Sequence, residues 1–391
     1  MKILAVETSC DETALCIIEG TGETSSPRIS VLGTSLFSQA KIHEQYGGVF
    51  PNLAKREHAR NLVPLLKNLL ENNNLSLGAH REFTPEQHTF LQKLLEREPD
   101  LYTACSEYLQ TCTPPDIDAI AVTVGPGLEP ALWVGINFAK ALSYIWGKPI
   151  VPVNHMEGHI ASVLTASSAE QSTPVVFPAL ALLISGGHTE LVLVRGWSQY
   201  EVVGQTRDDA VGEAFDKVAR MLSLPYPGGP HISRLAHEAR TSNAEVFSIR
   251  FPRPMLHSGD LDFSFSGLKT AVLTAIQKTG DLTDDTKKAI AREFEDAVVE
   301  VLREKTMHAI ERYNIRTLII GGGVIANTRI REAFAELHTH FPELTLLLPE
   351  KGLETDNAVM IAIAGYLQAQ TNPHTLSTDP NTIRAQGNLS L

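Results

Sequence analysis

Two histidines four residues apart, His155 and His159, are the first residues in the chain whose types and spacing could do chemistry. On a helix with about 100° per residue their side chains lie roughly 40° apart, so one metal ion could contact both. Glu157 points roughly 200° away from His155 on the same helix. In the zinc-protease motif the glutamate directly follows the first histidine. The spacing therefore allows a metal pair and argues against a metalloprotease, while an idle surface pair stays an alternative.

A carboxylate that could complete this site occurs in the stretch 355–357, directly before an apolar helical run. Two histidine nitrogens and the Asp356 oxygen suit Zn²⁺ or Fe²⁺, and they leave coordination positions for substrate oxygens. A second interpretation has no ligand in it, because Thr355 or Asp356 could simply cap the helix that follows.

Three glycine-rich turns, at 185–189, 225–230 and 321–327, follow or separate expected elements. None fits the dinucleotide fingerprint or the Walker pattern. Backbone N–H groups in such turns can nevertheless hold phosphate or acyl oxygens. Asn327 opens a helix after the third turn, where capping and ligand binding are compatible roles. Ser185 and His188 do not predict a nucleophile–base pair, because the G-x-S-x-G elbow is absent.

An acidic stretch at 208–217 places Asp209, Glu213 and Asp216 on one face of an expected helix. The spacing of four and then three residues is that of a helix face. This face is either a solvated stripe near a helix N-terminus or a source of one carboxylate for ribose hydroxyls.

Composition describes an ordinary globular chain of 391 residues, with 43% hydrophobic and 20% charged residues. No apolar run approaches the roughly 18 residues of a membrane span, and the first residues read as a strand, so we expect a cytoplasmic protein with no membrane partner. Four cysteines without a C-x-x-C pair are expected to be reduced thiols. The net charge of −12 disfavours simple nucleic-acid binding, so any RNA would need a local basic face or a helper protein.

The sequence contains an internal repeat of one structural plan. Residues 3–20 and 179–196 each read as strand, polar turn and strand, and each is followed by a third expected strand. A strand–helix–strand segment follows in both halves. We therefore expect duplicated mixed-sheet α/β domains with a cleft between two lobes. The further elements are strands at 29–37, 200–206, 117–124, 149–153, 316–323 and 344–349, and helices at 130–147, 327–340, 209–223, 285–313 and 356–370.

The segment 72–115 has a different character, with polar ends and apolar residues at helical spacing. It predicts an inserted helical hairpin. Either this hairpin is a surface elaboration that packs on its own lobe, or it is a docking surface for a partner.

Taken together, blocks along nearly the whole chain resemble those of the universal tRNA threonylcarbamoyladenosine synthase family, and its bacterial tRNA N6-adenosine threonylcarbamoyltransferases in particular. The blocks occur in family order and include ETSCDET (7–13), YGGVFPNLAKREH (46–58), NHMEGH (154–159), LISGGHT (183–189), GEAFDK (212–217), LDFSFSGLKT (261–270), GGGVIAN (321–327) and TDNAVMIA (355–362). The resemblance implies the two-lobed fold of actin, Hsp70 and sugar kinases. It implies an N-terminal lobe at 1–152 with the insertion, a C-terminal lobe at 153–364 with the metal and adenylate site, and a segment at 365–391 returning toward the N-terminal lobe.

The resemblance also implies an activity: transfer of a threonylcarbamoyl group from threonylcarbamoyl-AMP to N6 of adenosine 37 in tRNAs that read ANN codons. One divalent ion per subunit, Fe²⁺ or Zn²⁺, would be held by His155, His159 and Asp356. Asp11 and Glu12 match acidic residues that matter for activity. The residues that would bind the adenylate are Leu183, Ile184, Ser185, Gly186, Gly187, Asp216, Gly229 and Asn327.

The implied partners are tRNA, an inactive paralogue that forms a heterodimer and a small P-loop ATPase. Basic residues such as Lys55, Arg56, Arg250, Arg253 and Lys269 could add a local surface for tRNA. An ATP-hydrolysing chaperone or kinase on the same fold is the alternative function. A non-catalytic scaffold of the same family is disfavoured, since a scaffold has no use for the three metal ligands.

Overall fold

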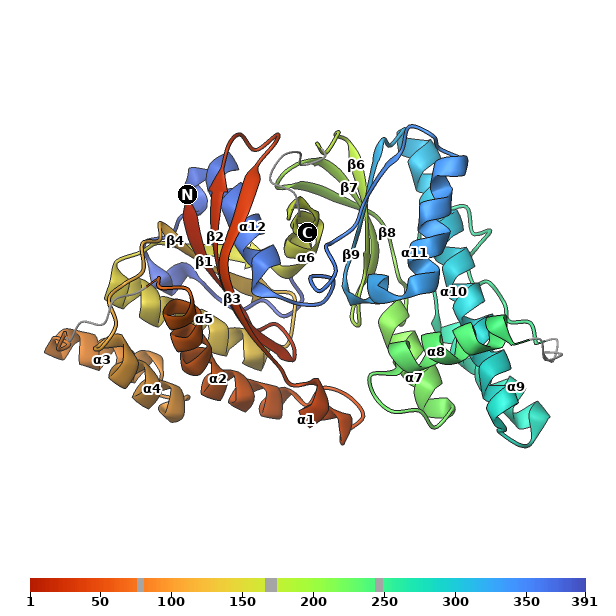
Figure 1. The fold of residues 1–391 in the computed structure, drawn as a ribbon, viewed down its shortest axis with the longest axis horizontal. Coiled ribbons are helices and arrows are strands. Elements are labelled where there is room, and N and C mark those ends of the chain that lie inside the picture. Colours follow the sequence, from red (N-terminus) through yellow and green to blue (C-terminus); the bar gives the residue numbers. More distant parts are fainter. Residues whose placement is uncertain (76–80, 166–173, 243–248) are drawn as a thin grey trace. The chain divides into compact units, whose positions relative to one another are not determined.

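Two compact units make up the chain in the computed structural model, which describes residues 1–75, 81–165, 174–242 and 249–391 (Figure 1). The first unit consists of residues 1–174 together with 350–391, and the second of residues 175–349. These boundaries differ from the expected ones at 152/153 and 364/365. The reason is α12 (Ala358–Thr371), whose packing against strands and a helix of the first unit brings residues from 350 onward into that unit.

The first unit is built on a five-stranded mixed sheet with the order β3-β2-β1-β4-β5. The antiparallel part consists of β1 (Lys2–Glu7), β2 (Glu12–Thr21) and β3 (Arg28–Ser38). The parallel part adds β4 (Ala119–Gly125) and β5 (Ile150–Asn154). The central strand β1 and its neighbour β4 are buried along almost their whole length, as their continuous apolar sequences predict.

The second unit repeats this order as β8-β7-β6-β9-β10. Its antiparallel strands are β6 (Ala179–Ile184), β7 (Thr189–Gly196) and β8 (Gln199–Gln205), and its parallel strands are β9 (Thr317–Gly321) and β10 (Thr345–Leu347). Strand for strand the two sheets share one topology. The expected duplication of a mixed α/β sheet is therefore confirmed.

Helices cover both faces of the first sheet. Leu4 and Val6 face one core with the helices α2 (Pro51–Asn72) and α5 (Glu129–Trp146). On the opposite face Ala121 meets Gly365 of α12, which is buried almost all round and carries few polar residues. The short helices α1 (Ala40–Glu44) and α6 (His155–Ala161) complete the unit.

The insertion is a helical hairpin, as the sequence predicts, formed by α3 (Pro85–Leu94) and α4 (Pro99–Leu109). It packs on α2 and α5 of its own unit through buried residues such as Leu91 and Cys105. Two specific contacts fasten it: Lys55 pairs with the buried Glu98 at 2.8 Å, and Phe90 stacks on Tyr144. Residues 76–80, in its first part, lie outside the described residues.

In the described part of the second unit, five helices pack toward one face of the sheet: α7 (Val211–Met221), α8 (Gly228–Thr241), α9 (Ser266–Thr279), α10 (Asp284–Tyr313) and α11 (Thr328–Ala335). Their apolar faces and the strands β6, β7 and β9 share one core. No helix in the described ranges is long and apolar enough to cross a bilayer.

Candidate functional site

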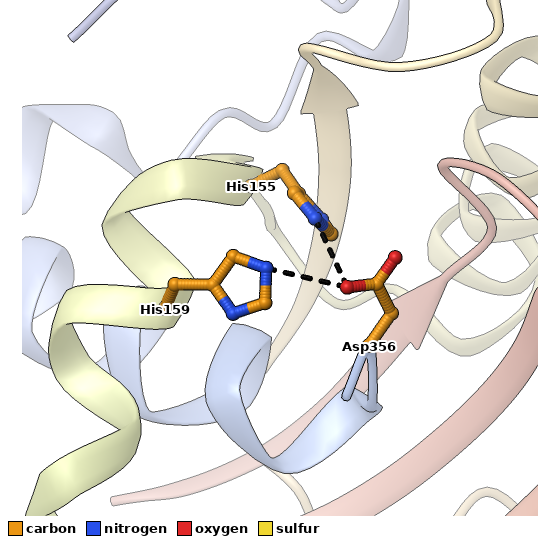
Figure 2. Close-up of side chains that lie close together, drawn as sticks. All are labelled: His155, His159 and Asp356. Carbon is orange, nitrogen blue, oxygen red and sulfur yellow. Dashed lines mark ion pairs between the residues drawn. The ribbon is translucent and has the colours of Figure 1, made fainter. Parts of the chain in front are cut away.

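His155, His159 and Asp356 come together inside the first unit, although some 200 residues separate them in sequence (Figure 2). The Nε2 atom of His155 lies 3.4 Å from Oδ1 of Asp356, and the Nε2 atom of His159 lies 3.2 Å from the same oxygen. One ligand atom from each residue lies within 4.8 Å of the other two. The two imidazole rings are nearly perpendicular, so their nitrogens approach the carboxylate from different directions.

An asparagine caps α6, which carries both histidines, and another caps α12, which begins just after Asp356. The side-chain oxygen of Asn154 accepts from the Met156 N–H at 2.8 Å and starts α6. The side-chain oxygen of Asn357 accepts from the Met360 N–H at 3.1 Å and starts α12. The sequence-based alternative, in which Thr355 or Asp356 is the cap, is therefore wrong. Because Asn357 satisfies the helix end, the Asp356 carboxylate is left to face the histidines.

Gly158, between the two histidines, allows α6 and α12 to approach closely. A Cβ atom at this position would lie 2.9 Å from Cδ1 of Ile361 and 3.2 Å from Cγ of Met360. Such distances are shorter than normal side-chain contacts, so a larger residue would require the side chains of Ile361 and Met360 to move, or α12 to shift. The close approach of α6 to α12, the helix that follows Asp356, is therefore matched to this glycine.

The three residues fit a divalent metal ion. Two imidazole nitrogens and a carboxylate oxygen are ligands that Zn²⁺ and Fe²⁺ share. The Nε2 atom of His159 is buried, and among the described residues it has no hydrogen-bond partner and one ion-pair partner, the Asp356 oxygen. Burial would lower the pKa of His155, but Asp356 and Glu7 raise it well above its usual value. A bound cation would replace the proton that otherwise balances these carboxylates.

Glu157 does not face the histidine pair. Its carboxylate accepts a hydrogen bond at 2.5 Å from the side-chain amide of Gln368 on α12. The arrangement agrees with the helical angle expected from the sequence, and Glu157 is not placed as a protease-type general base beside the histidines.

Three residues that the sequence analysis did not single out surround His155. Glu7, fully buried at the end of β1, lies 3.2 Å from Nδ1 of His155 through its Oε2 atom. Thr123 donates to the same carboxylate oxygen at 2.6 Å, and Ser9 lies 3.2 Å from Nδ1 through its hydroxyl. A charged residue at the end of an apolar strand is the signal that could have found Glu7, because a buried carboxylate requires partners.

Asp11 and Glu12 lie at the turn between β1 and β2, in the same unit as the candidate metal ligands. The Ser38 hydroxyl donates to Glu12 at 3.0 Å. Burial, followed by the charges of Asp11 and Asp356, raises the pKa of Glu12 to about 9. The turn and the His155–His159–Asp356 group thus form one electrostatically connected region.

Most of the predicted adenylate residues lie at one end of the second sheet. The turn after β6 is closed by the Ser185 hydroxyl, which accepts from the N–H groups of Gly187 and His188 at 3.3 and 3.1 Å. These bonds give Ser185 a turn-forming role, in agreement with its rejection as a nucleophile. Gly186 and Gly187 are exposed, and a Cβ atom at either would meet nothing within 4 Å.

Leu183 and Ile184 differ from the glycines that follow them. Both belong to β6, both side chains are fully buried, and Leu183 is paired with strands on both sides. Contact with a ligand would therefore have to come from backbone atoms at the strand end.

The helix that carries Asp216 begins beside this turn, since the Gly212 N–H donates to the Ser185 carbonyl at 3.2 Å. Asp216 in turn accepts from the N–H of Gly228 at 2.7 Å, next to Gly229 in the first turn of α8. Asp209 lies before α7 and not on its face, because the helix begins at Val211. Its carboxylate pairs with Lys217 at 3.0 Å and with Lys269.

Asn327 caps α11, as the sequence predicts, by accepting from the Ile330 N–H at 3.0 Å. Its amide nitrogen donates to the buried carboxylate of Glu295 at 2.7 Å, and Glu295 also pairs with Arg240 at 2.6 Å. Gly322, directly after β9, packs closely against the end of β6. Its φ is +93°, and a Cβ atom there would clash with the Ile184 carbonyl, so no side chain fits.

Known proteins are similar to this chain in sequence and in fold. The family model described as tRNA N6-adenosine threonylcarbamoyltransferase matches residues 30–80 and 101–363. Proteins with that name from Paraburkholderia xenovorans and Herminiimonas arsenicoxydans are 42% and 41% identical, over 95% and 97% of this chain and 94% and 95% of theirs. In structure, HypF from T. kodakarensis is similar in fold, with a TM-score of 0.53 at 12% identity over 97% of this chain and 48% of that protein.

The relatives are similar over almost their full length, and the matched segments include the stretches that carry both histidines, Asp356 and the glycine-rich turns. The chain therefore belongs to the tRNA N6-adenosine threonylcarbamoyltransferase family, a family of transferases, as the sequence resemblance predicts.

Proposed function

We propose that this protein transfers a threonylcarbamoyl group from threonylcarbamoyl-AMP to N6 of adenosine 37 in tRNAs that read ANN codons. The observation that carries the proposal is the convergence of His155, His159 and Asp356 in a chain of this family. These residues would hold one divalent ion, Fe²⁺ or Zn²⁺. When bound, such an ion supplies Lewis acidity toward a carbonyl oxygen.

The donor is a mixed anhydride and is already activated, so the protein needs no covalent nucleophile. The hydrogen bonds of the Ser185 hydroxyl within its own turn fit this requirement. As the new N–C bond forms, the bond between the carbonyl carbon and the phosphate oxygen breaks, AMP leaves, and N6 loses a proton. We assign proton acceptance to Asp11 in the acidic turn, because burial and the neighbouring carboxylates raise the pKa of Glu12 to about 9 and keep that group protonated near neutral pH.

In the second unit, the exposed backbone of Gly186 and Gly187 is suited to phosphate or carboxylate oxygens, because neither residue has a side chain and the space beside each is open. The N–H of Gly186 is the better donor to such a ligand, since the N–H of Gly187 donates to the Ser185 hydroxyl. Asp216 on α7 and Gly229 in the first turn of α8 would take the ribose end of the adenylate. Asn327 would contribute through the backbone around its cap, since both ends of its side-chain amide are engaged.

Transfer to tRNA requires a surface that binds a polyanion, although the chain is acidic overall. Some of its basic residues already pair with acidic side chains of the protein, and these are less available to tRNA. Arg253 pairs with Glu293 and Glu300, Lys269 with Asp209 and Lys55 with Glu98, so these cations have internal partners. Arg250 instead lines a groove of about 560 Å³ along α9 together with Lys278. Within the described residues neither of these two forms an ion pair, and we assign them to tRNA phosphates.

An inactive paralogue and a small P-loop ATPase would assist the reaction in the cytoplasm, and the paralogue would extend the tRNA surface. The transferase is favoured over an ATP-hydrolysing chaperone or kinase because the matched family is a transferase family.

The proposal is tested by incubating the protein with threonylcarbamoyl-AMP, an unmodified ANN-reading tRNA, a divalent metal and the helper proteins from the same genome. Digestion of the tRNA and mass spectrometry of its nucleosides should show threonylcarbamoyl-adenosine. The product should be absent when His155 and His159 are both alanine. Rapid ATP hydrolysis without tRNA or helpers, and no modified nucleoside, would instead favour the chaperone or kinase.

A further inference from the structure

The carboxylate of Glu7 is buried in the first unit, and it faces His155, one of the candidate metal ligands. Glu7 ends β1 and is 0% exposed. Within the described residues its only ion pair is with His155, at 3.2 Å between Oε2 and Nδ1. A carboxylate buried without Lys or Arg is costly unless hydrogen bonds satisfy its oxygens, so this placement calls for an explanation.

Two further groups hold the carboxylate in place. The Thr123 hydroxyl on β4 donates to Oε2 at 2.6 Å, and the Ser9 N–H donates to Oε1 at 2.5 Å. Thr123 lies on β4, the strand beside β1, and Ser9 lies in the turn directly after β1. Glu7 is therefore fixed before any ligand binds, and its remaining acceptor capacity on Oε2 is directed at His155.

The two nitrogens of His155 face different partners. Nδ1 faces Glu7 and the Ser9 hydroxyl, while Nε2 faces Oδ1 of Asp356 at 3.4 Å. When Nδ1–H donates to a carboxylate, the lone pair of a neutral imidazole is placed on Nε2. That nitrogen is the one that lies among the candidate metal ligands.

We propose that Glu7 is a positioning residue for the metal centre: it accepts the Nδ1–H of His155, fixes the orientation and tautomer of this ring, and so presents Nε2 to the cation. The inference rests on the proposed metal site and adds a residue to it. Carboxylate partners of this kind orient histidine ligands, and losing one typically costs 10- to 100-fold in metal affinity.

The test measures metal binding directly. Purified metal-free protein is titrated with Zn²⁺ against a chromophoric chelator, and with Co²⁺ by its visible absorption. Glu7→Gln keeps the size and removes the charge, and we expect it to weaken Zn²⁺ binding about 10- to 100-fold. Glu295→Gln is the matched control, because Glu295 is equally buried and charged but contacts Arg240 and Asn327 in the second unit. It should lose stability without losing metal affinity.

A second measurement does not depend on a variant. In Zn²⁺-loaded wild-type protein labelled with ¹⁵N-histidine, long-range proton–nitrogen spectra should show His155 protonated at Nδ1 and metal-bound at Nε2. A proton on Nε2, or coordination through Nδ1, overturns the inference, as does Zn²⁺ affinity in Glu7→Gln equal to that of the wild type. If the wild type itself binds neither metal, the proposed metal site fails, which is a separate result.

Discussion

In the first unit, β1 ends in the buried Glu7 and a turn with two acidic residues, whereas the equivalent strand β6 of the second unit ends in Ile184 and a turn with two glycines. The strand order is the same in both. The first turn offers side-chain carboxylates in the unit that holds the two histidines, and the second offers exposed glycine backbone without side chains. One topology therefore supports two kinds of binding chemistry, chosen by the residues at the strand ends.

The largest expected effect comes from removing the side chains that make the first unit different. His159→Ala, or Asp356→Ala, removes one of the three converging ligand atoms. Metal affinity should fall by at least about 100-fold, the upper end of the effect of losing an outer partner. Isothermal titration with Zn²⁺ measures it. An unchanged affinity would mean that the metal binds elsewhere and that these residues do not give the first unit its own binding chemistry.

Gly158→Ala tests whether the approach of α12 positions Asp356. The new Cβ would press on Ile361 and Met360, and overpacking of this kind costs about 1–3 kcal/mol. Urea unfolding should show that loss, and metal titration should show weaker binding.

Gly229→Ala is the control for this prediction in the second unit, because a Cβ there meets nothing within 4 Å. It should leave the free energy of unfolding nearly unchanged. Equal losses in both variants would mean that contact with α12 is not the cause.

Asn327→Ala tests whether the cap of α11 stabilises the second unit without affecting metal binding. It removes the cap of α11 and leaves the buried Glu295 with one partner fewer. Loss of an N-cap costs about 0.5–2 kcal/mol. The free energy of unfolding should fall by this amount while Zn²⁺ affinity stays constant, and a parallel loss of metal binding would contradict the separate roles of the two units.

The tRNA surface offers a comparison within the second unit. Replacing Arg250 and Lys278 by alanine should weaken tRNA binding several-fold and lower the salt dependence, by roughly one unit of log–log slope per phosphate contact. Arg253→Ala should mainly reduce stability, because Arg253 pairs with Glu293 and Glu300. Filter binding at several salt concentrations separates these outcomes, and a larger loss of tRNA affinity in Arg253→Ala would reverse the assignment.

The smallest effect concerns pH. Burial opposes ionisation of Asp208, but bonds from Ser264, Phe265 and Ser266 at the start of α9 lower its pKa from 3.8 to about 2. A lowered folded-state pKa gives stability that is complete above the unfolded pKa and lost as the pH falls toward 2. Asp208→Asn should therefore cost at most about 1 kcal/mol at pH 6, since the carboxylate is exposed.

That difference should shrink steadily between about pH 4 and pH 2 when both proteins are unfolded with urea. A constant difference over this range would show that the Asp208 carboxylate does not stabilise α9 through its charge.

Much of this molecule follows from local sequence. Continuous apolar runs specify β1, β4, β6 and β9, because central strands are buried on both faces. The four-residue spacing of His155 and His159 placed both on one side of α6 and turned Glu157 away from them, toward Gln368. The internal repeat was readable because each half keeps the same order of strands and helix.

What the sequence alone could not determine concerns contacts between distant segments. The cap of α12 is Asn357 and not Thr355 or Asp356, because the Asn357 side chain is the one that accepts from the Met360 N–H. The unit boundaries differ from the expected ones because α12 packs on the first sheet. Glu7 gained its partners from β4 and α6, more than 110 residues away. Spacing fixes which residues share a face, whereas burial and close packing decide which faces meet.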